Sequence, residues 1–286
     1  MPSLPRFEYL APKTLEEAVT ILKKEQRAKV IAGGTDLLVK MKKREATYQK
    51  LIGLKNIPNL NFIIEEENVI KLGPMVIHEE AEKSLLLNRY TDFLAEACRH
   101  LGSYQVRCMG TVAGNVCNAS PSADTIPSLL ILDARLRIVN PKSDRVLPID
   151  QFIVKPFETV LQRDEILTAI EISKPLPGSK GVYLKIPKVT EKDETLVGIA
   201  LLLKREFSTG IIEDIRIGLG SVAPFPIRAK KTETYLRGKN PEDRKSMREA
   251  KDLLMIEISP RSRADYRRKM TEYLFDEALR AVLNKS

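Results

Sequence analysis

The sequence predicts an α+β protein built from three units that follow one another along the chain. Strand-like and helix-like patterns alternate through residues 1–55, as in a small α/β unit, and a second unit occupies residues 56–175. A segment rich in proline and glycine then precedes residues 181–286, where strand-like runs come before helix-like runs. A chain of 286 residues is long enough to form this many packed cores.

The first unit is predicted to hold a helix, a short strand and a glycine-containing turn. Thr14 with Glu17 three residues later forms a capping box, and apolar residues recur behind it at helical spacing. The strand at residues 28–32 stops at a Gly-Gly pair, after which Thr35 or Asp36 can cap a second helix.

The second unit begins with a predicted hairpin and two predicted helices. Residues 62–64 and 69–72 flank a short polar turn, which favours two antiparallel strands. We expect one helix over residues 79–87 and another that begins at Thr91 or Asp92.

The third unit starts after residues 174–181, where two prolines and two glycines exclude helix and inner strand. The apolar run at residues 196–203 is too short to span a bilayer and predicts a buried strand. The last helix is expected over residues 265–284. Its predicted buried face consists of Tyr266, Met270, Tyr273, Leu274, Ala278, Ala281 and Val282.

Composition narrows the class of protein. Hydrophobic residues make up 43% and charged residues 30% of the chain, a balance typical of a soluble globular protein. The formal net charge of +9 raises nucleic acid, a membrane surface or an acidic ligand as partners. Acidic residues are interspersed with the basic ones, so the basic clusters at residues 40–44 and 261–269 are interpreted as solvated helix faces.

Cysteine and histidine content argues against a metal site on this chain. Cys98, Cys108 and Cys117 form an odd set without a CxxC pair, which predicts no disulfide framework and a reducing, cytoplasmic location. An iron–sulfur cluster normally takes four thiolates. His78 and His100 lie far apart in sequence and show no zinc-ligand pattern.

Two glycine-containing segments are the candidates for ligand binding. Residues 32–36 lie between a predicted strand and a predicted helix, where free N–H groups suit a phosphate; the alternative is a plain tight turn. Residues 110–124 are dense in small and hydrogen-bonding side chains and could wrap a polar ligand; the alternative is a long surface loop. The chain has no GxGxxG, no P-loop and no nucleophile motif, so no catalytic residue is assigned.

In this order and spacing, the two segments resemble the FAD-binding medium subunit of molybdenum hydroxylases, the family of carbon monoxide dehydrogenase and xanthine dehydrogenase. The resemblance covers essentially the whole chain, and the second segment, ending in Ala119-Ser120-Pro121, is its most specific part. Ala113 departs from the usual glycine and Ile77 from the usual capping threonine. Supporting matches are Phe7-Glu8-Tyr9, Gln105-Val106-Arg107, Asp164-Glu165-Ile166-Leu167, Tyr183-Leu184-Lys185, Gly220-Ser221-Val222-Ala223-Pro224 and Ala264-Asp265-Tyr266-Arg267.

The resemblance implies a fold and a binding site. The fold is the two-subdomain FAD-binding fold of the vanillyl-alcohol oxidase (PCMH) type, formed by residues 1–55 and 56–175, followed by an α+β C-terminal domain. FAD is the implied cofactor. The residues implied to bind it are Val30, Ile31, Ala32, Gly33, Gly34, Thr35, Asp36, Leu37, Leu101, Thr111, Ala113, Gly114, Asn115, Ala119, Ser120, Asp124, Leu167 and Lys185.

The resemblance also implies a role in electron transfer. Residues 32–36 would hold the pyrophosphate, while Leu101, Leu167 and Lys185 would approach the flavin. FAD would take electrons from a two-iron, two-sulfur partner subunit, downstream of a molybdenum-cofactor large subunit, and pass them to NAD+ or another acceptor. Three alternatives are a scaffold subunit that has lost FAD, a stand-alone flavin oxidase of the vanillyl-alcohol oxidase type, and a basic nucleic-acid-binding module. We expect no nucleic acid partner and no membrane span.

Overall fold

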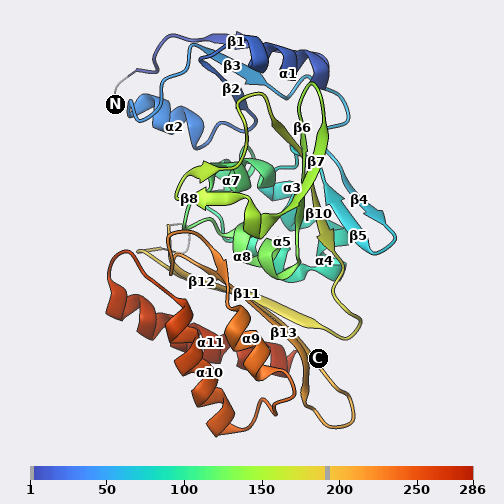
Figure 1. Cartoon of the computed structure of the whole chain (residues 1–286), viewed down its shortest axis with the longest axis vertical. Helices are drawn as coiled ribbons and strands as arrows, with labels where there is room; N and C mark the ends of the chain where they lie inside the picture. The colour runs from blue at the N-terminus through green and yellow to red at the C-terminus, as the bar shows by residue number, and fades with distance from the viewer. Residues whose placement is uncertain (1–2, 191–193, 286) are drawn as a thin grey trace.

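The computed structural model describes residues 3–190 and 194–285. Figure 1 shows an elongated molecule in which the chain proceeds from one end to the other. The N-terminal elements lie at one end, a middle group of strands and short helices follows, and the C-terminal sheet with its helices forms the other end.

The N-terminal unit is a three-stranded parallel sheet with strand order β1-β3-β2. The predicted cap of α1 is present, because the Thr14 hydroxyl accepts a hydrogen bond from the Glu17 amide at 3.1 Å. The apolar face of α1 then packs with β2 and β3 in a small core. The elements are β1 (Glu8–Leu10), α1 (Leu15–Lys24), β2 (Ala28–Ile31), α2 (Leu37–Lys42) and β3 (Lys50–Gly53).

The middle unit is a five-stranded antiparallel sheet, in the order β4-β5-β10-β6-β7, packed against short helices. The predicted hairpin is present as β4 and β5. The elements of the middle unit are β4 (Ile63–Glu66), β5 (Val69–Leu72), α3 (His78–Lys83), α4 (Leu85–Tyr90), α5 (Asp92–Arg99), α6 (Tyr104–Arg107), α7 (Val112–Asn118), α8 (Thr125–Ile131), β6 (Arg135–Val139), β7 (Asp144–Pro148), η1 (Ile149–Gln151), β8 (Ile153–Lys155), β9 (Glu158–Thr159) and β10 (Ile166–Ser173).

One prediction for the middle unit is wrong in detail. The helix expected over residues 79–87 is two helices, because Ser84 takes an extended conformation and its hydroxyl caps α4 by accepting from the Leu87 amide at 3.3 Å. The side-chain cap at Ile77 is absent from α3, as its apolar side chain implies, although the Glu80 carboxylate accepts a hydrogen bond from the Ile77 amide at 3.2 Å.

The C-terminal unit is a four-stranded antiparallel sheet with three helices. The run at residues 196–203 is the predicted buried strand, and it is buried on both faces. Val197, Ile199 and Leu201 join the C-terminal core, whereas Ala200 and Leu202 join the main core of the middle unit. The elements are β11 (Lys180–Pro187), β12 (Thr195–Arg205), β13 (Ile212–Gly220), β14 (Ile227–Arg228), α9 (Lys230–Leu236), α10 (Arg244–Glu257) and α11 (Ala264–Asn284).

The buried face of α11 differs from the predicted one. Tyr266 and Tyr273 are 42% and 51% exposed, and Ala281 is also exposed. The buried positions are Thr271, Leu274, Phe275, Ala278, Leu279 and Val282. The apolar face is therefore rotated away from the tyrosines, whose hydroxyl-bearing rings tolerate a surface position.

The basic cluster at residues 261–269 is also more than a solvated helix face. The Arg267 guanidinium donates to the Leu196 carbonyl at 2.6 Å and to the Ser221 carbonyl. Arg268 donates to the Met255 carbonyl at 2.6 Å. These arginines therefore fasten α11 to the sheet and to α10.

The C-terminal sheet packs closely on the middle unit. A Cβ atom on Gly181 would overlap the Phe93 ring of α5, and one on Gly218 would overlap the Pro127 carbonyl oxygen of α8. Glycine is thus required where the sheet approaches these two helices. No helix in the described part of the chain combines the length and apolar character that a bilayer crossing requires.

Candidate functional site

The two glycine-containing segments lie against each other. Gly33 in the first segment sits so close to the backbone of Met109 and Gly110 that a Cβ atom would overlap the Met109 carbonyl oxygen. A Cβ atom on Gly110 would lie 3.2 Å from the Thr35 hydroxyl. The close approach that Gly33 permits is therefore to the second segment's backbone, so the two segments form one site.

A polar contact between α2 and α7 supports this junction. The Lys40 ammonium donates to the Asn118 side-chain oxygen at 2.6 Å and lies 4.6 Å from the centre of the Phe157 ring. Gly34, with φ of +72°, makes the turn into α2. Asp36 precedes α2 but makes no side-chain cap hydrogen bond.

Residues 110–124 are not a plain surface loop, because they contain α7. Thr111 caps this helix, and its hydroxyl accepts from the Gly114 amide at 2.9 Å. That amide is thereby satisfied within the protein. A Cβ atom on Gly114 would meet only the Thr111 side chain within 4 Å, so this face of α7 is otherwise open to a ligand.

The structure places the remaining residues of the second segment in distinct environments. Ala113 is buried in the main core at 4% exposure, so its extra methyl group packs inside the protein. Ala119 ends α7 in a left-handed conformation with φ of +49°. The Asn115 side-chain oxygen accepts from the Thr125 hydroxyl at 2.7 Å, and the Ser120 and Ser122 hydroxyls lie 3.0 Å apart.

Asp124 is the centre of a second, buried polar cluster. Its Oδ1 atom accepts hydrogen bonds from the Tyr183 and Thr195 hydroxyls, both at 2.6 Å, and lies 3.4 Å from the Lys185 ammonium. Lys185 also donates to the His100 carbonyl at 2.7 Å, which brings it next to Leu101 in the chain. Asp124 Oδ2 accepts no hydrogen bond within residues 3–190 and 194–285, so this oxygen is available to a ligand hydroxyl.

Burial dominates the electrostatics of this cluster. Burial raises the pKa of the Asp124 carboxyl, and the Lys185 ammonium opposes that rise. Burial, and then the charge of Asp124, raise the pKa of the Tyr183 hydroxyl well above its ordinary value. Tyr183 therefore stays protonated and acts as a hydrogen-bond donor that holds the carboxylate in place.

The predicted site residues thus fall into two groups. The first segment meets the start of the second, while Lys185 contacts both Asp124 and the carbonyl of His100, the chain neighbour of Leu101. The hydrogen bond from Thr125, the neighbour of Asp124, to Asn115 joins the second group to α7. Leu167 lies in β10 and is 4% exposed within the main core, while Val30 and Ile31 lie in β2 and Leu37 begins α2.

Two residues of the Asp124 cluster escaped the sequence prediction. Thr195 gave no signal, and Tyr183 entered the sequence analysis only as part of the matched segment Tyr183-Leu184-Lys185. Tyr183 and Lys185 are two residues apart on β11, so their side chains leave the same face of the strand. That spacing could have linked Tyr183 to the site as soon as Lys185 was chosen.

Comparison with known proteins defines the class. Residues 5–175 match the family described as the FAD binding domain in molybdopterin dehydrogenase. Residues 182–282 match the CO dehydrogenase flavoprotein C-terminal domain. The chain therefore belongs to the FAD-binding family of the molybdopterin dehydrogenases. It is an oxidoreductase subunit whose cofactor is FAD, and the predicted family, α+β fold class and cofactor are confirmed.

Individual relatives match over nearly the full length. The carbon monoxide dehydrogenase medium chain of Hydrogenophaga pseudoflava is 30% identical over 97% of each chain. A putative xanthine dehydrogenase FAD-binding subunit of Escherichia coli is 26% identical, again over 97% of each chain. The structure of reconstituted carbon monoxide dehydrogenase from Oligotropha carboxidovorans superimposes with a TM-score of 0.94 at 28% identity over 100% of each chain.

The residues present fit FAD. The open face at Gly114 admits close approach of a ligand to the backbone, and Asp124 Oδ2 offers a free acceptor for a hydroxyl group. The methyl group of Ala113 points into the core, so the departure from the family's glycine does not obstruct the site. Ala113 therefore gives no support to the alternative of a scaffold subunit that has lost FAD.

Proposed function

We propose that this chain is the electron-transfer subunit of a molybdenum-containing hydroxylase. FAD bound to it takes electrons from iron–sulfur clusters of a partner subunit and passes them to NAD+ or another acceptor. The observation that carries the proposal is the contact of Gly33 with Met109 and Gly110, which joins the two glycine-containing segments into one cradle.

In this proposal the chain's own residues bind and orient the cofactor. The backbone of residues 32–36 holds the pyrophosphate, and Thr111, Gly114 and Asn115 line the pyrophosphate, ribityl and nucleotide parts of the cofactor. Asp124 Oδ2 accepts from a hydroxyl of the cofactor. Leu101, Leu167 and Lys185 approach the flavin, and Lys185 places a positive charge there. The bound flavin supplies the redox chemistry, so no acid or base from this chain is needed.

The partners and the location belong to the same proposal. The relatives are named as medium chains and FAD-binding subunits, which supports a large molybdenum-cofactor chain and a small two-iron, two-sulfur chain as partners. The three free cysteines support a reducing cytoplasm. We divide the chain into two FAD-binding subdomains, residues 1–55 and 56–175, and a C-terminal domain, residues 181–286; the separate sheets support this division.

The test compares the purified complex with and without FAD. The complex with substrate should show reduced iron–sulfur signals by electron paramagnetic resonance in both states, but it should reduce the acceptor only when FAD is present. NAD+ and an artificial dye serve as the two acceptors. If acceptor reduction survives complete removal of FAD, the chain does not carry the electrons out of the complex.

A further inference from the structure

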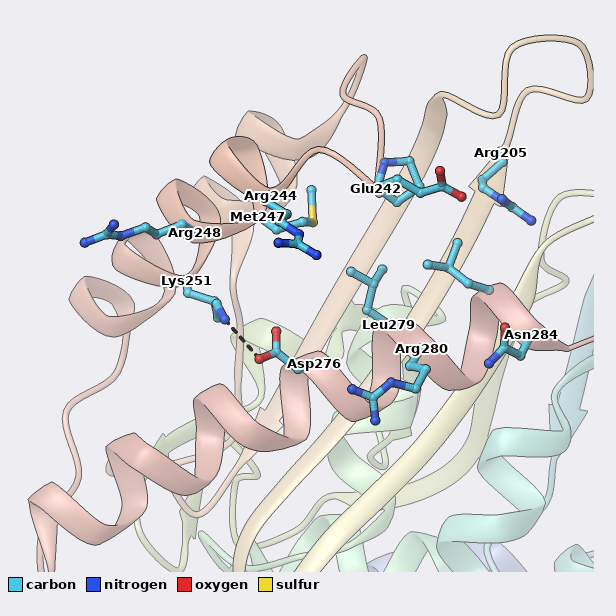
Figure 2. Close-up of a pocket in the computed structure, with 12 residues that line it drawn as sticks. Arg205, Glu242, Arg244, Met247, Arg248, Lys251, Asp276, Leu279, Arg280 and Asn284 are labelled. Atoms are coloured by element: carbon cyan, nitrogen blue, oxygen red, sulfur yellow. Dashed lines mark hydrogen bonds and ion pairs between the residues drawn. The ribbon is translucent and has the colours of Figure 1, made fainter.

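The C-terminal unit carries a groove far from the glycine-containing segments. It has a volume of about 620 Å³ and lies between the start of α10 and the end of α11, with Arg205 at the end of β12 on its border. In Figure 2 the Lys251–Asp276 ion pair links α10 to α11, while Arg205, Arg244 and Asn284 come from three different elements.

The groove is strongly basic. Five of its residues are cationic and two, Glu242 and Asp276, are acidic, and Asp276 is already paired with Lys251 at 2.9 Å. The side chains of Arg205, Arg244 and Arg248 make no hydrogen bond or ion pair within the part of the chain that the structure describes. Unpaired arginines around one groove indicate a site for carboxylates or phosphates.

Two features favour an acidic protein segment over a single compact anion. The cations are spread, since Arg244 and Lys251 are seven residues apart, which is about 10 Å along a helix. The groove also exposes apolar surface, because Met247 and Leu283 are only half-buried beside it. A lone phosphate would need converging donors and would gain nothing from apolar contacts.

We propose that this groove docks an acidic segment of a partner chain, with carboxylates on the arginines and one apolar side chain on Met247 and Leu283. The inference rests on the proposed assembly with partner subunits. The groove lies at the end of the molecule opposite the N-terminal sheet, so a partner segment docked in it leaves the candidate FAD site uncovered (Figure 1).

The first experiment measures peptide binding to the full chain by fluorescence anisotropy. The probe is a labelled peptide whose glutamates flank one leucine, and its control carries glutamines in place of the glutamates. We expect binding of the acidic peptide only, weakened by added salt. Arg248→Glu should weaken it about tenfold or more, whereas Lys245→Glu should change it by less than about twofold.

Lys245 is a matched control because it is exposed on the same helix but does not line the groove. Both substitutions reverse one charge. Equal losses in the two variants would show attraction by net charge alone and overturn the proposal. Binding of inorganic triphosphate or of vesicles of anionic lipid in place of the peptide would overturn it as well.

The second experiment uses the purified complex and a zero-length carbodiimide cross-linker, which joins lysine to carboxylate. The variant Arg248→Lys should cross-link to an acidic segment of a partner chain, while Lys245 should not. Flavin content is measured in parallel. If no such cross-link forms in a complex that retains FAD, the proposal of a docking groove is overturned and the proposed function is not affected. Loss of FAD or of electron transfer would instead bear on the proposed function.

Discussion

At the scale of single residues, the buried Asp124 carboxylate is the most demanding feature of the chain. Its burial is tolerated because the Tyr183 and Thr195 hydroxyls and the Lys185 ammonium all point at one oxygen. The second oxygen accepts no hydrogen bond from the residues that the structure describes. A charge held in place on one side and free on the other is suited to orient a ligand.

His78 is a second buried ionisable residue, and it makes stability depend on pH. Burial, together with the charge of Arg107, lowers the pKa of His78 from 6.5 to about 4, and its Nδ1 atom has no hydrogen-bond partner in the described part of the chain. The neutral form is therefore favoured in the folded protein. The contribution of neutral His78 to the free energy of unfolding is therefore present above pH 6.5 and is lost as the pH falls toward 4.

We expect the free energy of unfolding to fall by about 2 kcal/mol from this group between pH 7 and pH 5, measured by denaturant titration. His78→Leu should remove this part of the dependence of the free energy of unfolding on pH. His100→Gln is the control, because His100 is partly exposed and pairs with Glu96 at 2.7 Å. If the free energy of unfolding of His78→Leu depends on pH as strongly as that of the unchanged protein, the pKa of His78 is not lowered by folding.

At the scale of the elements, the glycines of the first segment serve different purposes. Gly33 is required by the carbonyl of Met109, a backbone atom that cannot rotate away. Gly34 is required by its φ of +72°, and a Cβ atom added there would lie 3.0 and 3.2 Å from the flexible side chains of Ile31 and Leu38. Substitutions at Gly33 and Gly34 should therefore lower the free energy of unfolding by different amounts.

Gly33→Ala is expected to separate the two segments, lowering both the free energy of unfolding and the FAD retained after purification. Gly178→Ala is the matched control, since Gly178 has φ of +82° with open space around it and should cost only about 1–2 kcal/mol. Flavin absorbance per protein and denaturant titration give the two readouts. Full FAD retention in Gly33→Ala would mean that the contact with Met109 does not shape the site.

Local signals in the sequence predicted the elements better than their contacts. The cap at Thr14 and the strand at residues 196–203 depend on neighbours in the chain, and both are present. The rotated face of α11 was missed because Tyr266 and Tyr273 share the helical spacing of the core residues while remaining exposed. The contact of Gly33 with Met109 joins distant parts of the chain, so no periodicity reports it.

The candidate site was predictable only as far as the family resemblance extended. The glycine-containing segments, with Asp124 at the end of the second, were found from composition and spacing, and Lys185 from the resemblance. The direct contact of Asp124 with Lys185 depends on how the C-terminal sheet packs on α5 and α8, which a single sequence does not specify. The partner residues Tyr183 and Thr195 were missed for the same reason.

At the scale of the whole molecule, the C-terminal sheet is part of two cores at once. Tyr183, Ala200 and Leu202 belong to the main core, while the alternate residues of β12 face the C-terminal helices. Ion pairs from Arg216 and Arg228 to Asp133, the former at 2.6 Å, also cross this contact. The segment between β10 and β11 is therefore a covalent connection between parts already held together by packing.

A cut in that connection tests this interpretation. A protease site inserted at the exposed Gly178 should allow complete cleavage, and the two fragments should still elute together with bound FAD in size-exclusion chromatography. Apolar surface buried between the units, at roughly 25 cal/mol per Å², should hold them without the peptide link. The uncut insertion variant is the control. If the fragments separate in the absence of denaturant, the C-terminal sheet is held mainly by the chain connection, and the Asp124 cluster depends on an intact backbone.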